Sequence, residues 1–373
     1  MNLPVLPGAP SFRLVLAVTY RCNLRCPYCY VKLTSSTTMP FETAARAVEL
    51  ALEALPDGGA LYLAFFGGEP LLEPELIARA VAHARARGQS RGIRVFPRLT
   101  TNGTCLTPET LAMLQREEFE VTLSLDGVPA AHDRNRFLAS GAGSFALVEE
   151  GIQRARAAGM ALRANMVVDP STVRDLARGV EHVLSMGVTE VELSPNYDAD
   201  WDDAALAVMD AQYRQIGAAY TRSMSEGRRF ALGFLETKLA VASRGGYQES
   251  EHCAFGVGEM AVDPVGRIFP CERLIRDGGG DEMVIGRLPE GIDAARLARI
   301  RAPRGVLTSE CQDCGLNGMC TNWCACVNYS RTGAINEPDG LVCFIEDLCT
   351  SVAEDVARSV IPRTPALAGG DRP

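Results

Sequence analysis

Three cysteines near the start of the chain have the spacing of an iron–sulfur site. Cys22, Cys26 and Cys29 lie in the run CNLRCPYC, directly after the apolar segment 12–19. Three thiolates on one short loop can bind three irons of a [4Fe–4S] cluster, which leaves the fourth iron open to a small molecule. A structural zinc site needs four Cys or His ligands, and the first histidine of the chain is His83. The loop therefore predicts a cluster that takes part in chemistry.

The remaining cysteines indicate metal binding as well. The 373-residue chain has 13 cysteines, and nine of them lie between Cys253 and Cys349. Because the count is odd and no secretory signal is visible, metal binding explains them better than a disulfide framework, and we expect a cytoplasmic location. The formal net charge of −9 argues against a nucleic-acid-binding protein. No apolar run approaches the ~18 residues of a membrane span, so no membrane partner is expected.

The first part of the chain alternates between strand and helix patterns. Short apolar segments predict strands at 12–19, 61–66, 93–100, 121–125, 162–168 and 191–194. Periodic segments predict helices at 40–55, 74–87, 108–117, 145–158, 172–186 and 203–226. This alternation implies an α/β fold with a parallel sheet, in which ligands bind just beyond the carboxyl ends of the strands. The pattern alone fits a barrel or a doubly wound sheet.

Candidate binding residues follow three of the predicted strands. Gly67 and Gly68 let the backbone approach a ligand closely, and the carboxylate of Glu69 can accept hydrogen bonds from an ammonium group. Asn102 and Ser124 lie at the ends of the third and fourth strands. Turn chemistry is the alternative explanation for these polar and glycine residues.

The cysteine run, with Tyr28 before its last cysteine, resembles the signature of the radical S-adenosylmethionine (SAM) superfamily. The sequence GGE at 67–69 resembles its SAM-binding motif, and HDRNR at 132–136 resembles a stretch of its peptide- and protein-modifying members. The resemblance implies a partial (β/α)6 barrel over 12–225 and a [4Fe–4S] cluster whose open iron binds SAM. The residues that it implies near SAM are Tyr28, Gly67, Gly68, Glu69, Asn102, Ser124, Arg136 and Asn165. Asn165 faces either the barrel interior or the core, because the sequence does not fix the strand register.

The later cysteines resemble the SPASM extension of radical SAM enzymes. The segment 266–271 matches a Gly-x4-Cys element and 311–324 matches CxxCx5CxxxC. The resemblance implies a small SPASM domain at 251–350, with a β-hairpin that turns at 263–266 and two auxiliary [4Fe–4S] clusters, which makes three clusters in all. One auxiliary cluster would be held by Cys311, Cys314, Cys320 and Cys343, and the other by Cys253, Cys271 and Cys324. A zinc ribbon is the alternative explanation for these cysteines.

The sequence leaves two features of this second auxiliary cluster open. Related sulfatase maturases have a further cysteine shortly after the first, but residues 254–259 contain none. The alternatives for the fourth ligand are Cys326, Cys349, Cys105, a substrate group or an open iron. Glu272 stands where sulfatase maturases have an aspartate thought to act as the base, so it is a candidate catalytic residue. We expect its pKa to rise beside a water-free cluster, unless it is an ordinary surface carboxylate.

The resemblance implies an enzyme that cleaves SAM reductively to a 5′-deoxyadenosyl radical and abstracts hydrogen from a peptide or protein side chain. Such a maturase would form a crosslink or an oxidised residue in a ribosomally made peptide. The alternatives are an anaerobic sulfatase maturase that makes formylglycine, a dehydrogenase or epimerase for a small molecule, and a non-catalytic iron–sulfur scaffold or electron carrier. The expected partners are the substrate and a low-potential electron donor such as flavodoxin or ferredoxin.

Three further segments complete the predicted organisation. Residues 1–11 form an N-terminal extension, 226–250 a linker, and 351–373 a C-terminal helix and flexible tail. Because the extension is short, we expect a separate leader-peptide-binding protein, or another surface of the chain, if a leader is recognised.

Overall fold

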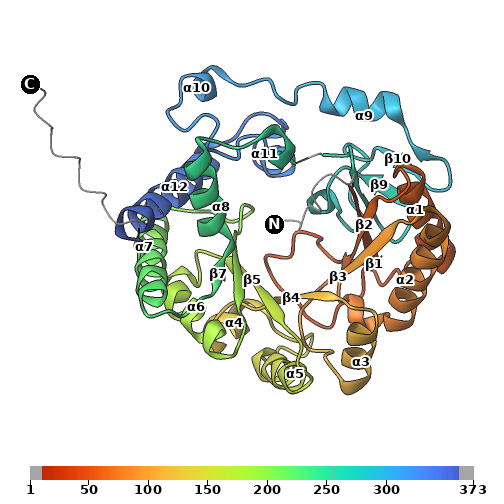
Figure 1. The fold of residues 1–373 in the computed structure, drawn as a ribbon, viewed down its shortest axis with the longest axis horizontal. Helices are drawn as coiled ribbons and strands as arrows, with labels where there is room; N and C mark the ends of the chain where they lie inside the picture. Colours follow the sequence, from red (N-terminus) through yellow and green to blue (C-terminus); the bar gives the residue numbers. More distant parts are fainter. Residues whose placement is uncertain (1–10, 254, 361–373) are drawn as a thin grey trace, which may run out of the picture.

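A curved parallel sheet with helices on its outer face forms the centre of the molecule (Figure 1). The structure is a computed structural model that describes residues 11–253 and 255–360. The parallel strands lie in the order β1 (Ser11–Thr19), β2 (Ala60–Gly67), β3 (Arg94–Thr101), β4 (Glu120–Ser124), β5 (Leu162–Val168), β6 (Glu190–Pro195) and β7 (Ala231–Leu232). The outer helices are α1 (Phe41–Glu53), α2 (Pro74–Gly88), α3 (Pro108–Arg116), α5 (Phe145–Ala157), α6 (Leu176–Ser185) and α7 (Asp203–Ser225). The predicted α/β fold with a partial barrel of βα units is confirmed.

The two faces of this sheet differ in chemistry because side chains alternate along each strand. In β4, Val121 and Leu123 belong to the main apolar core between sheet and helices, whereas Thr122 and Ser124 point to the other face. Every strand from β1 to β6 contributes to this core. The inner face is apolar on β1 and β2, where Val15, Ala17 and Phe66 belong to a second apolar cluster, and polar on β4 and β5. It is the face on which a ligand can be bound.

The C-terminal half extends the same sheet on the other side of β1. There, β8 (Glu259–Val262) pairs in parallel with β1, and β9 (Arg267–Phe269) pairs antiparallel with β8. The predicted hairpin is present, and its turn ends at Gly266, whose φ of +82° favours glycine. The sheet continues through β10 (Gly286–Arg287) and β11 (Gly291–Ile292). Because β8 lies against β1, the second cysteine-rich segment begins beside the strand that leads into the first.

The remaining helices lie around the whole sheet. They are α4 (Pro129–Asn135), α8 (Gly233–Arg244), α9 (Ala294–Arg301), α10 (Ser309–Gln312), α11 (Ala325–Thr332) and α12 (Gly340–Val360), with 3-10 turns η1 (Pro70–Leu72), η2 (Gln89–Arg91), η3 (Val173–Asp175), η4 (Glu249–Glu251) and η5 (Glu272–Leu274). Helix α12 packs along α7 and α8. A Cβ atom at Gly217 on α7 would lie 2.7 Å from Val352, so glycine allows this close approach.

Two predicted boundaries need correction. The segment 226–250 is more than a linker, because it contributes β7 to the edge of the barrel sheet and α8 to the packing against α12. A boundary at 350 falls inside the single helix α12, which begins at Gly340. Residues 1–10 and the predicted tail at 361–373 lie outside the described residues. Within the described part of the chain, none of the helices has the length and apolarity needed to cross a membrane.

Candidate active site

The loop after β1 brings together the thiols of Cys22, Cys26 and Cys29, all partly buried and none in a disulfide. The loop turns tightly, because the Cys29 N–H donates to the Cys26 carbonyl at 3.1 Å. Burial raises the pKa of Cys22 to about 12 and that of Cys26 to about 11. Bound iron would supply the positive charge that such thiolates need, so this soft sulfur donor set fits an iron–sulfur cluster. No three His, Cys, Asp or Glu side chains in 11–253 and 255–360 are placed to hold a single metal ion.

The glycines of the GGE motif pack against this loop. A Cβ atom at Gly67 would lie 2.4 Å from the Thr19 carbonyl oxygen, and one at Gly68 would lie 2.0 Å from that of Arg21. The N–H groups of Gly68 and Glu69 donate to the same two carbonyls at 2.7 and 2.8 Å. The sequence suggested that these glycines make room for a ligand. In the structure they make room for the backbone that leads into the cysteine loop.

Glu69 is fully buried and holds the ends of β2 and β3 together. Its carboxylate accepts hydrogen bonds from the backbone N–H of Leu71 at 3.0 Å and of Asn102 at 2.7 Å, and from the Thr101 hydroxyl at 2.7 Å. Burial raises the pKa of Glu69, and these hydrogen bonds oppose the rise. The predicted residue thus lies beside the cysteine loop, with its position set by three donors.

Asn102 connects the end of β3 to the cysteine loop. Its side-chain amide donates to Asn23 Oδ1 at 2.9 Å and lies 3.9 Å from the sulfur of Cys22. Its side-chain oxygen accepts from the backbone N–H of Thr104 at 3.0 Å. Asn102 therefore contacts Cys22 and its neighbour Asn23. It also lies at the end of β3, where the sequence predicts a contact with a ligand.

Asp126 is the centre of a buried polar group whose members the sequence did not connect. It pairs with Arg136, whose Nε lies 3.0 Å from Asp126 Oδ2, and it accepts a hydrogen bond from the Tyr28 hydroxyl. The backbone N–H of Val167 donates to its other oxygen at 2.9 Å. Burial lowers the pKa of Arg136, but Asp126, together with Tyr28 and Cys26, offsets this and leaves the pKa raised. The predicted residues Tyr28 and Arg136 are therefore brought together, although they are distant in sequence.

The strand register decides which way Asn165 points. Its neighbours Ala164 and Met166 belong to the main apolar core, so Asn165 lies on the inner face of β5. It pairs with Ser124 across the strands and accepts a hydrogen bond from the Ser194 hydroxyl at 2.6 Å. These three side chains form a polar strip on the inner wall of the barrel.

The cysteines of the C-terminal half form two separate groups. Cys253, Cys271, Cys324 and Cys326 meet in one apolar cluster with Phe255, Tyr197 and residues of α11. The second group comprises Cys311, Cys314, Cys320 and Cys343, whose thiols lie close enough for their charges to interact. Cys349 belongs instead to the main core, and Cys105 packs against that core from the loop after β3. The structure thus places Cys326 with Cys253, Cys271 and Cys324, and keeps Cys311, Cys314, Cys320 and Cys343 apart from them.

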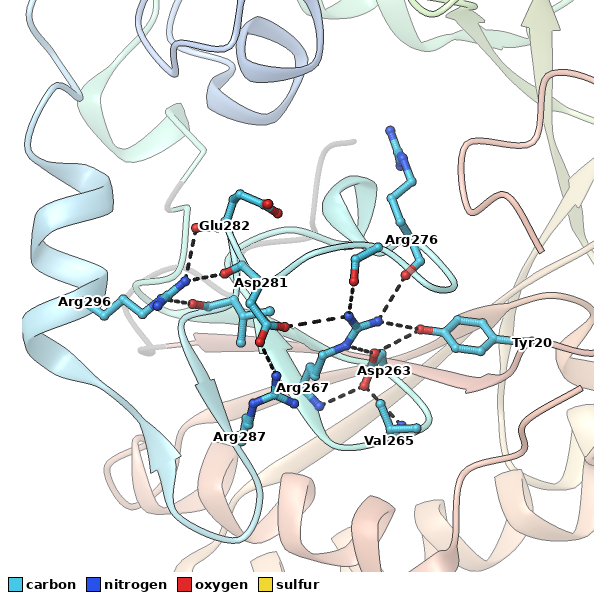
Figure 2. A network of polar contacts seen from close by, with 11 residues as sticks. Tyr20, Asp263, Val265, Arg267, Arg276, Asp281, Glu282, Arg287 and Arg296 are labelled. Atoms are coloured by element: carbon cyan, nitrogen blue, oxygen red, sulfur yellow. Dashed lines mark hydrogen bonds and ion pairs between the residues drawn. The ribbon is translucent and has the colours of Figure 1, made fainter. Parts of the chain in front are cut away.

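A buried polar network joins the cysteine loop to the C-terminal hairpin (Figure 2). The hydroxyl of Tyr20, two residues before Cys22, donates to Asp263 at 3.0 Å. Arg267 donates to the same carboxylate oxygen at 2.6 Å and to the carbonyls of Arg276 and Gly279 at 3.1 and 2.7 Å. Tyr20, which leads into the first cysteine loop, and the segment after Cys271 are thereby joined through the hairpin.

Comparison with known proteins identifies the first part of the chain. Residues 16–183 match the family model described as the radical SAM superfamily. The chain contains a radical SAM domain. The chain is 27% identical to the mycofactocin maturase MftC of Mycobacterium ulcerans, over 87% of this chain and 86% of that protein. It is 29% identical to the PqqA peptide cyclase of Streptomyces rochei, over 71% of this chain and 70% of that protein.

A solved structure shares the fold over both halves. The structure of native anSMEcpe with bound AdoMet superposes with a TM-score of 0.76 at 18% identity, covering 92% of this chain and 99% of that one. At this identity the likeness concerns the fold alone. It extends beyond the radical SAM domain into the cysteine-rich half, as the SPASM resemblance implies.

The environment of Glu272 differs from the expected one. Arg13 on β1 of the radical SAM domain donates to both carboxylate oxygens, at 2.8 and 2.6 Å. Burial acts to raise the pKa of Glu272, but the charge and hydrogen bonds of Arg13 outweigh it, so the pKa is lowered. The expectation of a raised pKa is wrong, because Arg13 lies opposite Glu272 and the distance between them in the sequence hides this contact. Glu272 is held as a carboxylate beside Cys271.

The residues that the sequence missed share one property. Asp126 and Asp263 are buried, Arg13 is half-buried, and each joins segments far apart in the chain. Asp-Gly is a common turn dipeptide, so the available signal for Asp126 was its position directly after a strand. Arg13 is a charged residue within an apolar strand, and such a residue needs a partner. This was the available signal for its pairing.

Proposed function

We propose that the chain is a radical SAM maturase that abstracts hydrogen from a side chain of a peptide or protein substrate. The observation that carries the proposal is the convergence of the cysteine loop, Glu69 and the Asp126–Arg136 pair at the carboxyl ends of β1 to β4. When bound at Cys22, Cys26 and Cys29, a [4Fe–4S] cluster supplies the electron that cleaves SAM to methionine and a 5′-deoxyadenosyl radical. The relatives named a maturase and a peptide cyclase support a peptide substrate.

Several residues would hold SAM beside the loop. Glu69, already fixed by three donors, would accept a hydrogen bond from the SAM ammonium group at the mouth of the barrel. Arg136 is oriented by Asp126 and would present its remaining N–H groups to the SAM carboxylate. The complete set of residues that we propose to lie next to SAM is Tyr28, Gly67, Gly68, Glu69, Asn102, Ser124, Arg136 and Asn165.

The inner wall would place the substrate side chain. Ser124, Asn165 and Ser194 supply hydrogen-bonding groups on the inner faces of adjacent strands. The rings of Tyr30 and Phe66 stack at 5.7 Å next to the cysteine loop and exclude water there. A polar strip beside a water-free apolar wall suits an enzyme that must orient one carbon–hydrogen bond and keep solvent from a reactive species.

We propose that the C-terminal half holds two auxiliary clusters. The proposed ligands are Cys311, Cys314, Cys320 and Cys343 for one, and Cys253, Cys271 and Cys324 for the other. Glu272, kept as a carboxylate by Arg13, would accept the proton released when the substrate radical loses its electron. The proposed proton acceptor thus lies beside Cys271, one of the proposed ligands of the cluster at Cys253, Cys271 and Cys324.

A reductant has to reach the first cysteine loop. Arg21, Arg25 and Lys32 are exposed in and around it, although the whole chain carries a net charge of −9. A small acidic electron carrier such as flavodoxin or ferredoxin would fit these cationic groups. A leader-binding protein remains a proposed partner if the substrate is a ribosomally made precursor.

The test uses the full-length chain, reconstituted anaerobically with iron and sulfide and then mixed with SAM and dithionite. The proposal expects 5′-deoxyadenosine, formed faster when the substrate peptide is added. The first peptide to test is one encoded beside the gene, with a serine- or cysteine-containing sulfatase peptide for comparison. A peptide that loses two hydrogen atoms without a change of backbone supports the maturase. Iron-loaded protein that forms no 5′-deoxyadenosine overturns the proposal, and formylglycine in the sulfatase peptide replaces it with the sulfatase-maturase alternative.

A further inference from the structure

The thiol of Cys326 lies among the three cysteines of the incomplete auxiliary set. Its sulfur is 3.9 Å from that of Cys324, and Cys326 packs in the same apolar cluster as Cys271, close enough for the two thiols to interact. Cys253 completes the group, since its thiol interacts electrostatically with those of Cys271 and Cys324. All four side chains pack into the same apolar cluster, and Cys326 is 6% exposed. Four sulfurs from three separate segments therefore converge on one buried spot.

We propose that Cys326 is the fourth thiolate ligand of the iron–sulfur cluster held by Cys253, Cys271 and Cys324. This inference rests on the proposed function, which places an auxiliary cluster at these three cysteines. A site with four protein thiolates is closed. No iron of this cluster is then left to bind the substrate directly.

The local backbone suits thiolates at both positions of this Cys-x-Cys pair. Cys324 is the N-cap residue of α11, and Cys326 is the second residue of that helix. The N-terminal end of a helix stabilises negative charge, so the start of α11 suits two anionic ligands of a bound cluster.

Cationic side chains surround the group. The Arg273 guanidinium lies near enough to Cys324 to favour its thiolate, and Arg301 interacts in the same way with Cys253. Arg304 donates a hydrogen bond to the carbonyl of Cys253. A cluster with four thiolate ligands carries net negative charge, and these guanidinium groups would compensate part of it.

The other candidate ligands are placed less well. Cys349 packs on α12 in the main core, and Cys105 lies in the loop after β3, near Glu69. Glu259 is the strongest competitor, because its Oε1 lies 3.2 Å from the Cys253 sulfur. That oxygen, however, already accepts the backbone N–H of Phe255 at 2.8 Å, and the other oxygen lies 3.8 Å from Arg13. Iron–sulfur clusters also favour thiolate over carboxylate.

An ordinary packing role is the alternative for Cys326, because buried free cysteines behave as small apolar residues. The experiment must therefore read the cluster itself. We choose a full-length background with Cys22, Cys26 and Cys29 all replaced by alanine, so that only the auxiliary sites bind iron. The protein is reconstituted anaerobically, its iron is counted, and the EPR spectrum of the reduced form is recorded with and without cyanide, which binds an iron that lacks a protein ligand.

The background is expected to hold about 8 irons per chain and to give a spectrum that cyanide does not change. Cys326→Ala in this background should either lose up to about 4 irons or give a spectrum that changes with cyanide. Cys326→Ser keeps the side-chain volume and should also alter the spectrum, which separates loss of a ligand from loss of packing. The control is Cys349→Ala, another buried cysteine, which should leave both readouts unchanged.

Several results would overturn the inference. A background that already responds to cyanide has an open iron. If Cys326→Ala and Cys326→Ser match the background in iron and spectrum, Cys326 is a packing residue. If Glu259→Gln alone creates the cyanide response, the carboxylate is the ligand. In these three cases the proposed auxiliary cluster survives, whereas a background that binds no iron overturns that part of the proposed function together with the inference.

Discussion

Two of the three cysteine sites of this protein are built in opposite ways. Cys22, Cys26 and Cys29 belong to one short loop, whereas the group at Cys326 draws its thiols from segments that begin near residues 253, 271 and 324. The first site needs only a loop held at the end of β1. The second exists only when β8, η5 and α11 are already packed together. A local site can therefore be recognised from its spacing, while a dispersed site depends on tertiary contacts that the spacing does not reveal.

The largest expected effect comes from breaking the local site alone. Cys26→Ala removes one of the three thiolates that would hold the SAM-binding cluster. We expect 5′-deoxyadenosine formation to be abolished and the iron content to fall by about 4 per chain. Iron analysis and chromatography of the SAM cleavage products measure both effects. A variant that still cleaves SAM at the parent rate would show that the first loop does not hold the reactive cluster.

The sequence predicts the local site well for a physical reason. Cysteine spacing, the glycines at 67–68 and the alternation of strands and helices are short-range properties, so they survive in the linear sequence. The fold class and the order of the βα units followed from them. The sequence could not show that Arg13 faces Glu272, because the two lie 259 positions apart and meet only when β8 pairs with β1.

The same reasoning explains why the pairing of Asp126 with Arg136 was missed. Arg136 was recognised from its neighbours in sequence, but its partner lies at the end of a different element. Cys326 was among several open alternatives for a comparable reason. Its position in the chain says nothing of Cys271, and the fold places the two thiols together.

The second test strains the local site without removing a ligand. In Gly68→Ala the new Cβ atom would lie 2.0 Å from the Arg21 carbonyl, so the turn or the cysteine loop must shift. A displacement of about 1 Å in a catalytic arrangement can cost about 100-fold in rate, and we expect a loss of that order in SAM cleavage. The auxiliary iron should stay bound, as measured by iron analysis.

The matched control for this test is Gly340→Ala, because a Cβ atom at Gly340 meets no other atom within 4 Å. It should cleave SAM at the parent rate. If Gly68→Ala is equally active, the close contact between the GGE turn and the cysteine loop does not position the site.

A third, smaller effect is expected when the buried pair beside the first site is weakened. Asp126→Asn keeps the shape of the side chain. It removes the negative charge that orients Arg136 and the carboxylate that accepts a hydrogen bond from the Tyr28 hydroxyl. We expect the dissociation constant of SAM to rise about tenfold, equivalent to about 1.4 kcal/mol. Equilibrium binding to the reconstituted protein measures this. Asp210→Asn, which weakens an ion pair with Arg214 at the surface, should leave SAM affinity unchanged.

The smallest effect on SAM cleavage should come from weakening the packing of the cysteine-rich C-terminal half. Lys238 on α8 donates to Glu346 on α12 at 2.6 Å and to the carbonyl of Met319 at 2.7 Å. Glu346 also accepts the backbone N–H of Thr321 at 2.9 Å, so this pair holds the segment around Cys320 against two helices. Lys238→Met leaves a buried carboxylate unpaired, and we expect the protein to lose about 3 kcal/mol of unfolding free energy.

The stability lost in Lys238→Met should be lost near the C-terminal cysteines and not at the first cysteine loop. Iron at the Cys311, Cys314, Cys320 and Cys343 group should be released at lower denaturant concentration than in the parent, while the SAM-binding iron should be released at an unchanged one. Arg214→Met breaks an exposed pair with Asp355 between α7 and α12 and should cost at most about 1 kcal/mol. Equal early release of both kinds of iron in Lys238→Met would mean that the two sites unfold as one unit. The first cysteine loop would then depend on tertiary packing as much as the C-terminal cysteines do.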